Sequence, residues 1–170
     1  MSLSLYQSSI PIFLRVLNNL KGVLTKAAAH AQARKIDDAA FTQARLFPDM
    51  FPLTGQVQIA TDMARAGAAR LTGGEPPKFE DNEATFAELI ARVEKTIAYV
   101  QSVTEAQFEG ADSRTITRPV RGQPKTFTPV NYLQQFILPN LYFHATTAYA
   151  LLRHGGVELG KGDFIGVIPA

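Results

Sequence analysis

Two polar side chains, Asn140 and His144, stand one helical turn apart on an otherwise apolar stripe near the end of the sequence. A carboxamide or an imidazole that is buried without a partner costs about 1 to 3 kcal/mol, so we expect both groups to be hydrogen-bonded or to coordinate an ion. An earlier helical stretch offers Gln56, Gln58 and Asp62 as partners. In helical bundles, metal ions are held by side chains at positions i and i+4 of one helix and by residues of facing helices. These five residues are therefore the candidate polar site.

The candidate metal ligands within this site are His144, Asn140, Gln58 and Asp62, and two interpretations of them remain open. A core histidine that is hydrogen-bonded to an amide or to buried water is commoner than a metal ligand. Asparagine and glutamine are weak ligands for zinc, whereas an oxygen-rich shell suits manganese, magnesium or iron. The other two histidines fall near the ends of helical stretches, where capping is their ordinary role.

A basic segment follows the third long helix, with four basic residues against one acidic residue and a net charge of +3. No aromatic residues interleave with these charges, so a solvated hairpin is favoured over a nucleic-acid patch. The charged residues of the segment are Asp112, Arg114, Arg118, Arg121 and Lys125.

The first long helix is predicted over about 3 to 33, where apolar residues recur at helical spacing. Pro11 either kinks this helix or lies in the first turn of a shorter helix that is capped by Ser8 or Ser9. We favour the long kinked helix. The segment 34–50 is expected to be an irregular connection.

The second long helix is predicted over about 52 to 71, with Gly73 as its left-handed terminator. Small residues on its inward face either let a neighbouring helix approach closely or leave room for a pocket. The third long helix begins with a possible capping box over 85–88 and carries one apolar stripe. We expect Arg92 to point outward from it and its buried face to hold no reactive group.

The last long helix begins at Thr128, whose hydroxyl caps it, with Pro129 at the first helical position. It is expected to end at His154, with Gly155 as the left-handed residue after it. Pro139 lies inside this helix and ought to bend it.

A small β-hairpin is predicted before the last helix, with strands over 115–119 and 125–128 and Arg121-Gly122 between them. The tail after 156 is expected to be extended. Four long helices with short links predict an all-α four-helix bundle with one small hairpin.

The composition is that of one compact domain spanning 1–170, because 46% hydrophobic and 19% charged residues exclude disorder. The absence of cysteine excludes disulfides, thiolate metal sites and cysteine nucleophiles. A formal charge of +2 gives no reason to expect nucleic acid or a membrane as a partner. No apolar run approaches the roughly 18 residues that span a bilayer, and no secretory signal is evident, so we expect a cytoplasmic protein.

Three segments carry a resemblance to a known family: RLFPDMFPLTGQVQIATDMA at 45–64, FEDNEATFAELIARVEKTI at 79–97, and LPNLYFHATTAYALLRHGGVELGKGDF at 138–164. With them, the chain resembles the DinB/YfiT-like metalloenzyme superfamily, and within it an uncharacterised bacterial branch, a domain of unknown function. The resemblance implies an up-down-down-up four-helix bundle that is often dimeric.

Metal-binding relatives in that superfamily hold a divalent ion with three histidines, one from the second helix and an H-x-x-x-H pair from the fourth. His144 matches the second member of that pair, but Asn140 stands at the first, and the second-helix position falls on Gln56 or Gln58. At most one of the three histidines remains, so the resemblance does not carry the metal chemistry over.

Two hypotheses follow, and the sequence leaves open whether the chain is an enzyme. The first is a DinB-like bundle, a homodimer, whose interior polar pocket is non-catalytic or binds a small molecule around a degenerate metal site. The alternative is a divalent-metal-dependent thiol transferase or hydrolase with His144 as principal ligand. Convergence of the candidate side chains within coordination distance would favour the enzyme, and a mutually hydrogen-bonded cluster would favour the binding protein.

Overall fold

The computed structural model describes residues 3–168, which are mostly helical with one small antiparallel hairpin. No helix within this range is both long and apolar enough to cross a membrane. The helices are α1 (Ile10–Arg34), α2 (Asp38–Thr42), α3 (Leu53–Leu71), α4 (Phe86–Gln101), α5 (Pro129–Asn131), α6 (Leu138–His154) and α7 (Lys161–Ile165). Two short 3-10 turns (Glu105–Phe108 and Ala111–Ser113), a π-helical turn η3 (Tyr132–Ile137) and the strands β1 (Ile116–Val120) and β2 (Gln123–Phe127) complete the described elements.

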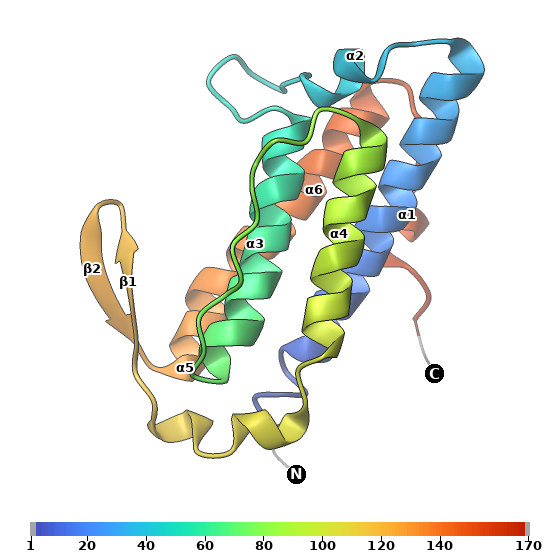
Figure 1. Cartoon of the computed structure of the whole chain (residues 1–170). Helices are drawn as coiled ribbons and strands as arrows, with labels where there is room; N and C mark the ends of the chain where they lie inside the picture. The colour runs from blue at the N-terminus through green and yellow to red at the C-terminus, as the bar shows by residue number, and fades with distance from the viewer. Residues whose placement is uncertain (1–2, 169–170) are drawn as a thin grey trace.

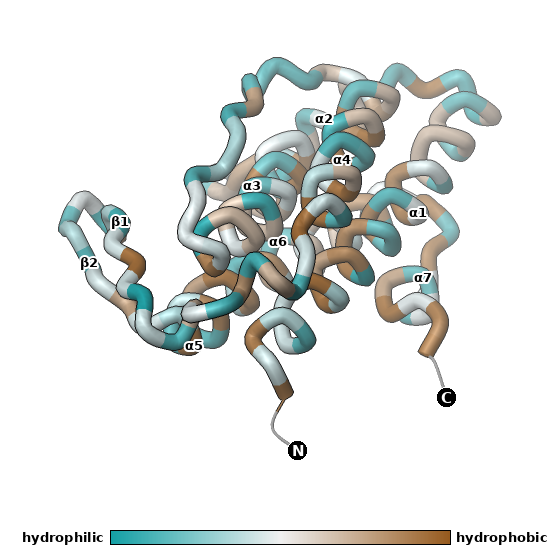
Figure 2. The backbone as a smooth tube through the Cα atoms, turned by 60° about the horizontal axis from the view of Figure 1, so that its bottom comes forward, coloured by the Kyte–Doolittle hydropathy of each residue, from teal (hydrophilic) through white to brown (hydrophobic). Residues whose placement is uncertain are grey.

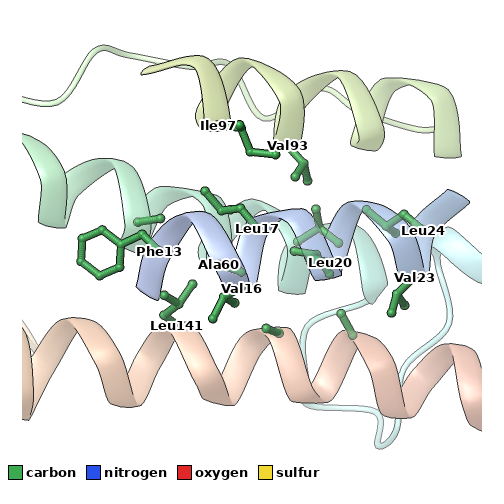
Figure 3. Close-up of a cluster of buried hydrophobic side chains, with 14 of the residues drawn as sticks. Phe13, Val16, Leu17, Leu20, Val23, Leu24, Ala60, Val93, Ile97 and Leu141 are labelled. Carbon is green, nitrogen blue, oxygen red and sulfur yellow. The ribbon is translucent and has the colours of Figure 1, made fainter. Parts of the chain in front are cut away.

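Four long helical segments surround one apolar core (Figure 1). α1 packs against α4, α3 packs against both α4 and α6, and α6 also contacts α1. Figure 3 shows that α1 supplies much of the core, with Phe13, Leu17 and Leu24 among its fully buried side chains, while Val93 comes from α4 and Leu141 from α6. The core therefore lies between the helices and is shared by all four.

The 72–85 link joins α3 to α4 and runs back along the length of the helices (Figure 1). Gly73 begins it with a φ of +84°, as the sequence predicted for the terminator of α3. The link ends at Thr85, whose hydroxyl accepts from the Glu88 backbone N–H while the Glu88 carboxylate accepts from the Thr85 N–H, which confirms the capping box.

The prediction of a long kinked helix over 3 to 33 is wrong, because α1 begins at Ile10. Pro11 lies in its first turn, where the missing N–H has no intrahelical partner to lose. Ser9 is the cap residue, and its hydroxyl donates back to the carbonyl of Leu5 at 2.7 Å. A short helix, α2, also lies within the segment that was expected to be irregular.

The hairpin is confirmed, with Arg121 and Gly122 both at positive φ in a two-residue turn. The last helix begins as predicted, since the Thr128 hydroxyl accepts from the Asn131 N–H. It stays helical through α5, η3 and α6, and Pro139 is accommodated next to the π-helical turn rather than by a break. In a regular α-helix, the ring of Pro139 would clash with the carbonyl four residues before it. That carbonyl belongs to the π-helical turn, which is wider than an α-helical turn.

Two expectations for the C-terminal region are wrong. Gly155 has a φ of −70°, and the positive φ falls on Gly156 instead, at +90°. The tail is not wholly extended, because α7 forms within it and packs against α1. The Asn19 side-chain amide secures it by donating to the carbonyl of Phe164 at 2.9 Å.

The small inward residues of α3 let neighbouring helices approach closely. A Cβ atom added at Gly67 would lie 2.8 Å from Cζ of Phe13 in α1 and 3.1 Å from Cγ2 of Ile137, just before α6. Both distances are shorter than ordinary van der Waals contact, so this position tolerates no side chain without movement of its neighbours. Of the two alternatives for this face, close approach holds at Gly67.

We therefore predict that Gly67→Ala lowers the free energy of unfolding by about 1 to 3 kcal/mol, because overpacking outweighs the better helix propensity of alanine. Gly22→Ala in α1 is the matched control, since nothing lies within 4 Å of the added methyl group. It should raise the free energy of unfolding by up to about 1 kcal/mol. Urea unfolding of both variants checks this, and equal stability of Gly67→Ala and wild type would contradict it.

Candidate functional site

His144 on α6 and Gln56 on α3 face each other between the two helices. Nδ1 of His144 lies 2.7 Å from the side-chain oxygen of Gln56, and both residues are buried. The Gln56 amide nitrogen donates to the backbone carbonyl of Phe51 at 3.0 Å. The structure thus brings together two of the five residues of the predicted polar site.

This short chain of hydrogen bonds determines which nitrogen of His144 carries the proton. Because the Gln56 NH₂ group points to the Phe51 carbonyl, its oxygen faces the imidazole and can only accept. Nδ1 is therefore the donor, and Nε2 holds a lone pair. His144 is 8% exposed, and Nε2 is not among the fully buried atoms without a partner in residues 3–168, so this nitrogen has a small contact with solvent.

Burial lowers the pKa of His144 below its ordinary value of 6.5. The side chain is neutral at physiological pH for that reason, and no carboxylate is hydrogen-bonded to it within residues 3–168 to offset the desolvation. The ring of Phe143 meets the imidazole edge-on, with ring centroids 5.1 Å apart. Phe143 and Phe51 are 56% and 58% exposed, so apolar surface lies at the outer side of this pair.

Asn140 lies one turn before His144 but bonds within its own helix. Its amide nitrogen donates to the carbonyl of Phe136 at 2.6 Å, and the residue is only partly buried. The pairing of a side chain with the carbonyl four residues earlier is a local alternative that asparagine often takes. Asn140 therefore adds no group to the His144–Gln56 pair through a direct hydrogen bond.

Gln58 and Asp62 turn toward α4 and the 72–85 link instead. The Gln58 amide nitrogen donates to the carboxylate of Glu83 at 2.8 Å. One oxygen of Asp62 accepts from Arg65 at 2.6 Å and from Arg92 at 2.8 Å. The two residues belong to an ionic cluster between α3, α4 and the link.

Arg92 is the centre of this ionic cluster, and the expectation that it points outward is wrong. Its side chain is 2% exposed. Its guanidinium donates to the Thr61 hydroxyl at 2.8 Å, to the Glu80 carbonyl at 2.9 Å and to the Glu83 carboxylate at 2.9 Å, in addition to Asp62. A buried charge needs such complete pairing. The buried face of α4 therefore does carry a charged group.

A signal for the inward direction of Arg92 is present in the sequence. Arg92 and Thr96 fall one turn apart beside the apolar positions Leu89 and Val93, and both are buried. Long arginine side chains at the edge of an apolar stripe can fold inward when polar partners lie there. Those partners come from another helix and from the link, so helical spacing alone does not reveal them.

Phe79 of the link covers the same cluster. Its ring lies 4.1 Å from the guanidinium carbon of Arg65 and 4.1 Å from Nζ of Lys95, measured to the ring centroid. Arg65 also donates to the carbonyl of Pro77. Burial opposes ionisation of Glu83, but hydrogen bonds from Gln58 and Arg92 outweigh it and lower the pKa of that carboxyl. The cluster thus attaches the link to both helices.

The residues present do not form the metal centre of the metal-binding relatives. The described part of the chain holds no group of three or more His, Cys, Asp or Glu side chains that could share a metal ion. Of the expected ligands, Gln58 and Asp62 are engaged in the ionic cluster and Asn140 bonds within its own helix, which leaves His144 as the one imidazole among them, at the α3–α6 edge. One imidazole and neutral amides are a poor donor set for zinc.

Comparisons with known proteins agree on the family of this fold. Residues 5–165 match the model of a domain of unknown function, DUF1993. The chain is also similar to a protein whose crystal structure is described as that of a DinB family member from Shewanella denitrificans. The two share 42% identity with a TM-score of 0.91, over 98% of this chain and 94% of that one. No curated protein matches the sequence.

We predict that Arg92→Met lowers the free energy of unfolding by about 3 kcal/mol, because it leaves the largely buried carboxylate of Glu83 without its cation and leaves Asp62 with Arg65 alone. Arg34→Met, at an exposed position at the end of α1, is the matched control and should change stability by less than about 0.5 kcal/mol. Urea unfolding measures both. Limited proteolysis should cut the 72–85 link faster in Arg92→Met alone, and resistance equal to wild type would contradict the role of the cluster.

We also predict that His144 contributes a pH dependence to stability. Its folded-state pKa is lowered, so the unfolded chain binds the proton more readily and the free energy of unfolding decreases as pH falls through about 6.5. His144→Gln keeps an amide donor for Gln56 but does not titrate. Wild type should therefore lose more thermal stability than this variant between about pH 8 and about pH 5.5. Equal losses would show that His144 is protonated as readily in the folded chain as in the unfolded one.

Proposed function

The chain belongs to the DUF1993 family, a branch of the DinB-like superfamily, and from that premise we propose that it binds a small molecule at Nε2 of His144. The family resemblance expected from the sequence is confirmed, and the family itself has no assigned function. The proposal therefore rests on the geometry around one side chain.

The observation that carries the proposal is the ordered chain from His144 through Gln56 to the Phe51 carbonyl. It holds a neutral imidazole with its lone pair toward solvent, ready to accept a hydrogen bond without a change of tautomer. The exposed rings of Phe51 and Phe143 belong to the residues that flank this pair and offer apolar contact. A ligand with a hydroxyl or N–H donor beside an apolar group fits this combination.

The proposal extends to the architecture. We infer that the chain is a single domain, an up-down-down-up four-helix bundle that assembles as a homodimer. The length of the 72–85 link, which returns along the helices before α4 starts, supports a parallel arrangement of α3 and α4. One continuous apolar core supports a single domain. The dimer follows from the family resemblance, and sedimentation of the purified protein tests it.

A second candidate function is a divalent-metal-dependent thiol transferase or hydrolase centred on His144. One observation favours it: metal-binding histidines commonly donate their other N–H to a carbonyl or carboxylate, as Nδ1 of His144 does to Gln56. The donors that surround His144 supply no second strong ligand within the described residues, so we rank this candidate below binding.

We predict that long-range ¹H–¹⁵N spectra show His144 as the Nδ1–H tautomer at about pH 7.5, and that Gln56→Met abolishes this preference. A library of small hydroxyl- and amide-bearing aromatic compounds should contain binders that shift the Nε2 resonance of His144. Binding should be lost in His144→Gln and retained in His154→Gln, which removes an exposed imidazole from the same helix. An Nε2–H tautomer, or binders that act equally on both variants, would overturn the proposal.

Elemental analysis separates the two candidates. The protein is purified without chelators or affinity-metal columns, alongside His144→Ala and the control His154→Ala. Stoichiometric metal that disappears only in His144→Ala would favour the metal enzyme over the binding protein. The proposed binding function is instead supported when none of the three proteins retains metal and the compound screen succeeds.

A further inference from the structure

The β1–β2 hairpin stands away from the helices and is largely hydrophilic along its tube (Figure 2). It lies in a stretch of sequence, 113–157, that contains no aspartate or glutamate. Its basic side chains Arg118, Arg121 and Lys125 form no ion pair among the described residues. The positive charge of the hairpin is therefore not balanced within the described chain.

Two of these cations are placed directly opposite each other. Arg118 of β1 pairs in register with Lys125 of β2, so both side chains leave the same face of the hairpin. Cβ atoms of such partners are only about 5 Å apart, and like charges in this position destabilise a hairpin. An anion between them would convert the repulsion into attraction.

Between the hairpin and the last helix lies an open concavity of about 500 Å³, and Lys125 of this pair lines it. The guanidinium carbon of Arg118 lies 4.2 Å from the centroid of the Phe136 ring, on the π-helical turn η3. The rings of Phe136 and Phe127 are 6.0 Å apart. The concavity is lined by basic, carboxamide and aromatic side chains, which include Arg121, Gln123, Lys125, Phe127, Gln135 and Phe136.

The turn of the hairpin adds an independent indication. Arg121 has a φ of +50°, in the left-handed region where glycine, asparagine or aspartate fit better. A non-glycine residue there strains the backbone. An arginine at this position suggests that its charge has a use, because its backbone conformation disfavours it.

From these observations, we propose that the hairpin and η3 form a binding site for a small organic oxyanion, a phosphate monoester or carboxylate joined to an aromatic group. Arginine pairs with both oxyanions through two parallel hydrogen bonds, and lysine adds a point charge. The carboxamides of Gln123 and Gln135 supply further donors, and Phe136 and Phe127 contact the aromatic part. The sequence predicted a solvated hairpin because no aromatic residues interleave with its charges. The aromatic surface comes instead from the following helix.

The test is a titration of ¹⁵N-labelled protein with phenyl phosphate, benzoate, inorganic phosphate and uncharged benzyl alcohol at constant ionic strength. We expect saturable shifts of the amides of Arg121, Gly122 and Gln135 with phenyl phosphate or benzoate, weaker shifts with inorganic phosphate, and none with benzyl alcohol. Arg118→Gln/Lys125→Gln should weaken binding at least about tenfold, since it removes two positive charges and their charge-assisted hydrogen bonds to the anion.

The matched control is Arg34→Gln/Arg153→Gln, which removes the same net charge from the ends of α1 and α6. It should bind as wild type does, and circular dichroism should show that both double variants stay folded. If both double variants weakened anion binding equally, the effect would come from the net charge of the protein and not from the hairpin, which would overturn the proposal. Shifts caused by a single-stranded oligonucleotide but by none of the small anions would overturn it as well.

Discussion

The buried guanidinium of Arg92 is the constraint on which the arrangement of polar groups depends. A charge whose side chain is 2% exposed must find its partners inside the fold, and Arg92 takes them from α3 and from the 72–85 link. Its pairing with Asp62 and Glu83 also holds Gln58, which donates to the same Glu83. Two of the expected ligands are thereby directed to the α3–α4 side and are engaged there.

The consequence is seen on the other side of α3, where Gln56 and His144 face each other between α3 and α6. With the carboxylates held by arginines, the imidazole meets a neutral carboxamide, remains uncharged and keeps one nitrogen toward solvent. Near Gly67, side chains of the neighbouring helical segments pack closely against α3 and leave no open space there. The hydrogen-bonded pair of His144 and Gln56 therefore lies at the edge of the core.

The last helical segment, formed by α5, η3 and α6, carries both candidate binding sites at different positions along its length. Its first part, the π-helical turn, presents Phe136 to the basic hairpin, and its second part presents His144 to α3. Asn140 lies between them and bonds back to the carbonyl of Phe136. Pro139 explains why this helix changes its turn there, since its ring interferes with regular α-helical bonding. The same chain segment thus places the Phe136 ring against the Arg118 guanidinium and carries His144 as a neutral hydrogen-bond acceptor.

The sequence by itself determined the elements whose signals are local: the capped starts at Thr85 and Thr128, the end of α3 near Gly73 and the two-residue turn of the hairpin. It also identified His144 as an inward polar residue, because helical periodicity states which side of a helix is apolar. Only the tertiary structure decided that Gln56 rather than Gln58 bonds to His144 and that Arg92 points inward. Residues two apart point about 200° apart on a helix, so the neighbouring element alone determines which of them finds a partner.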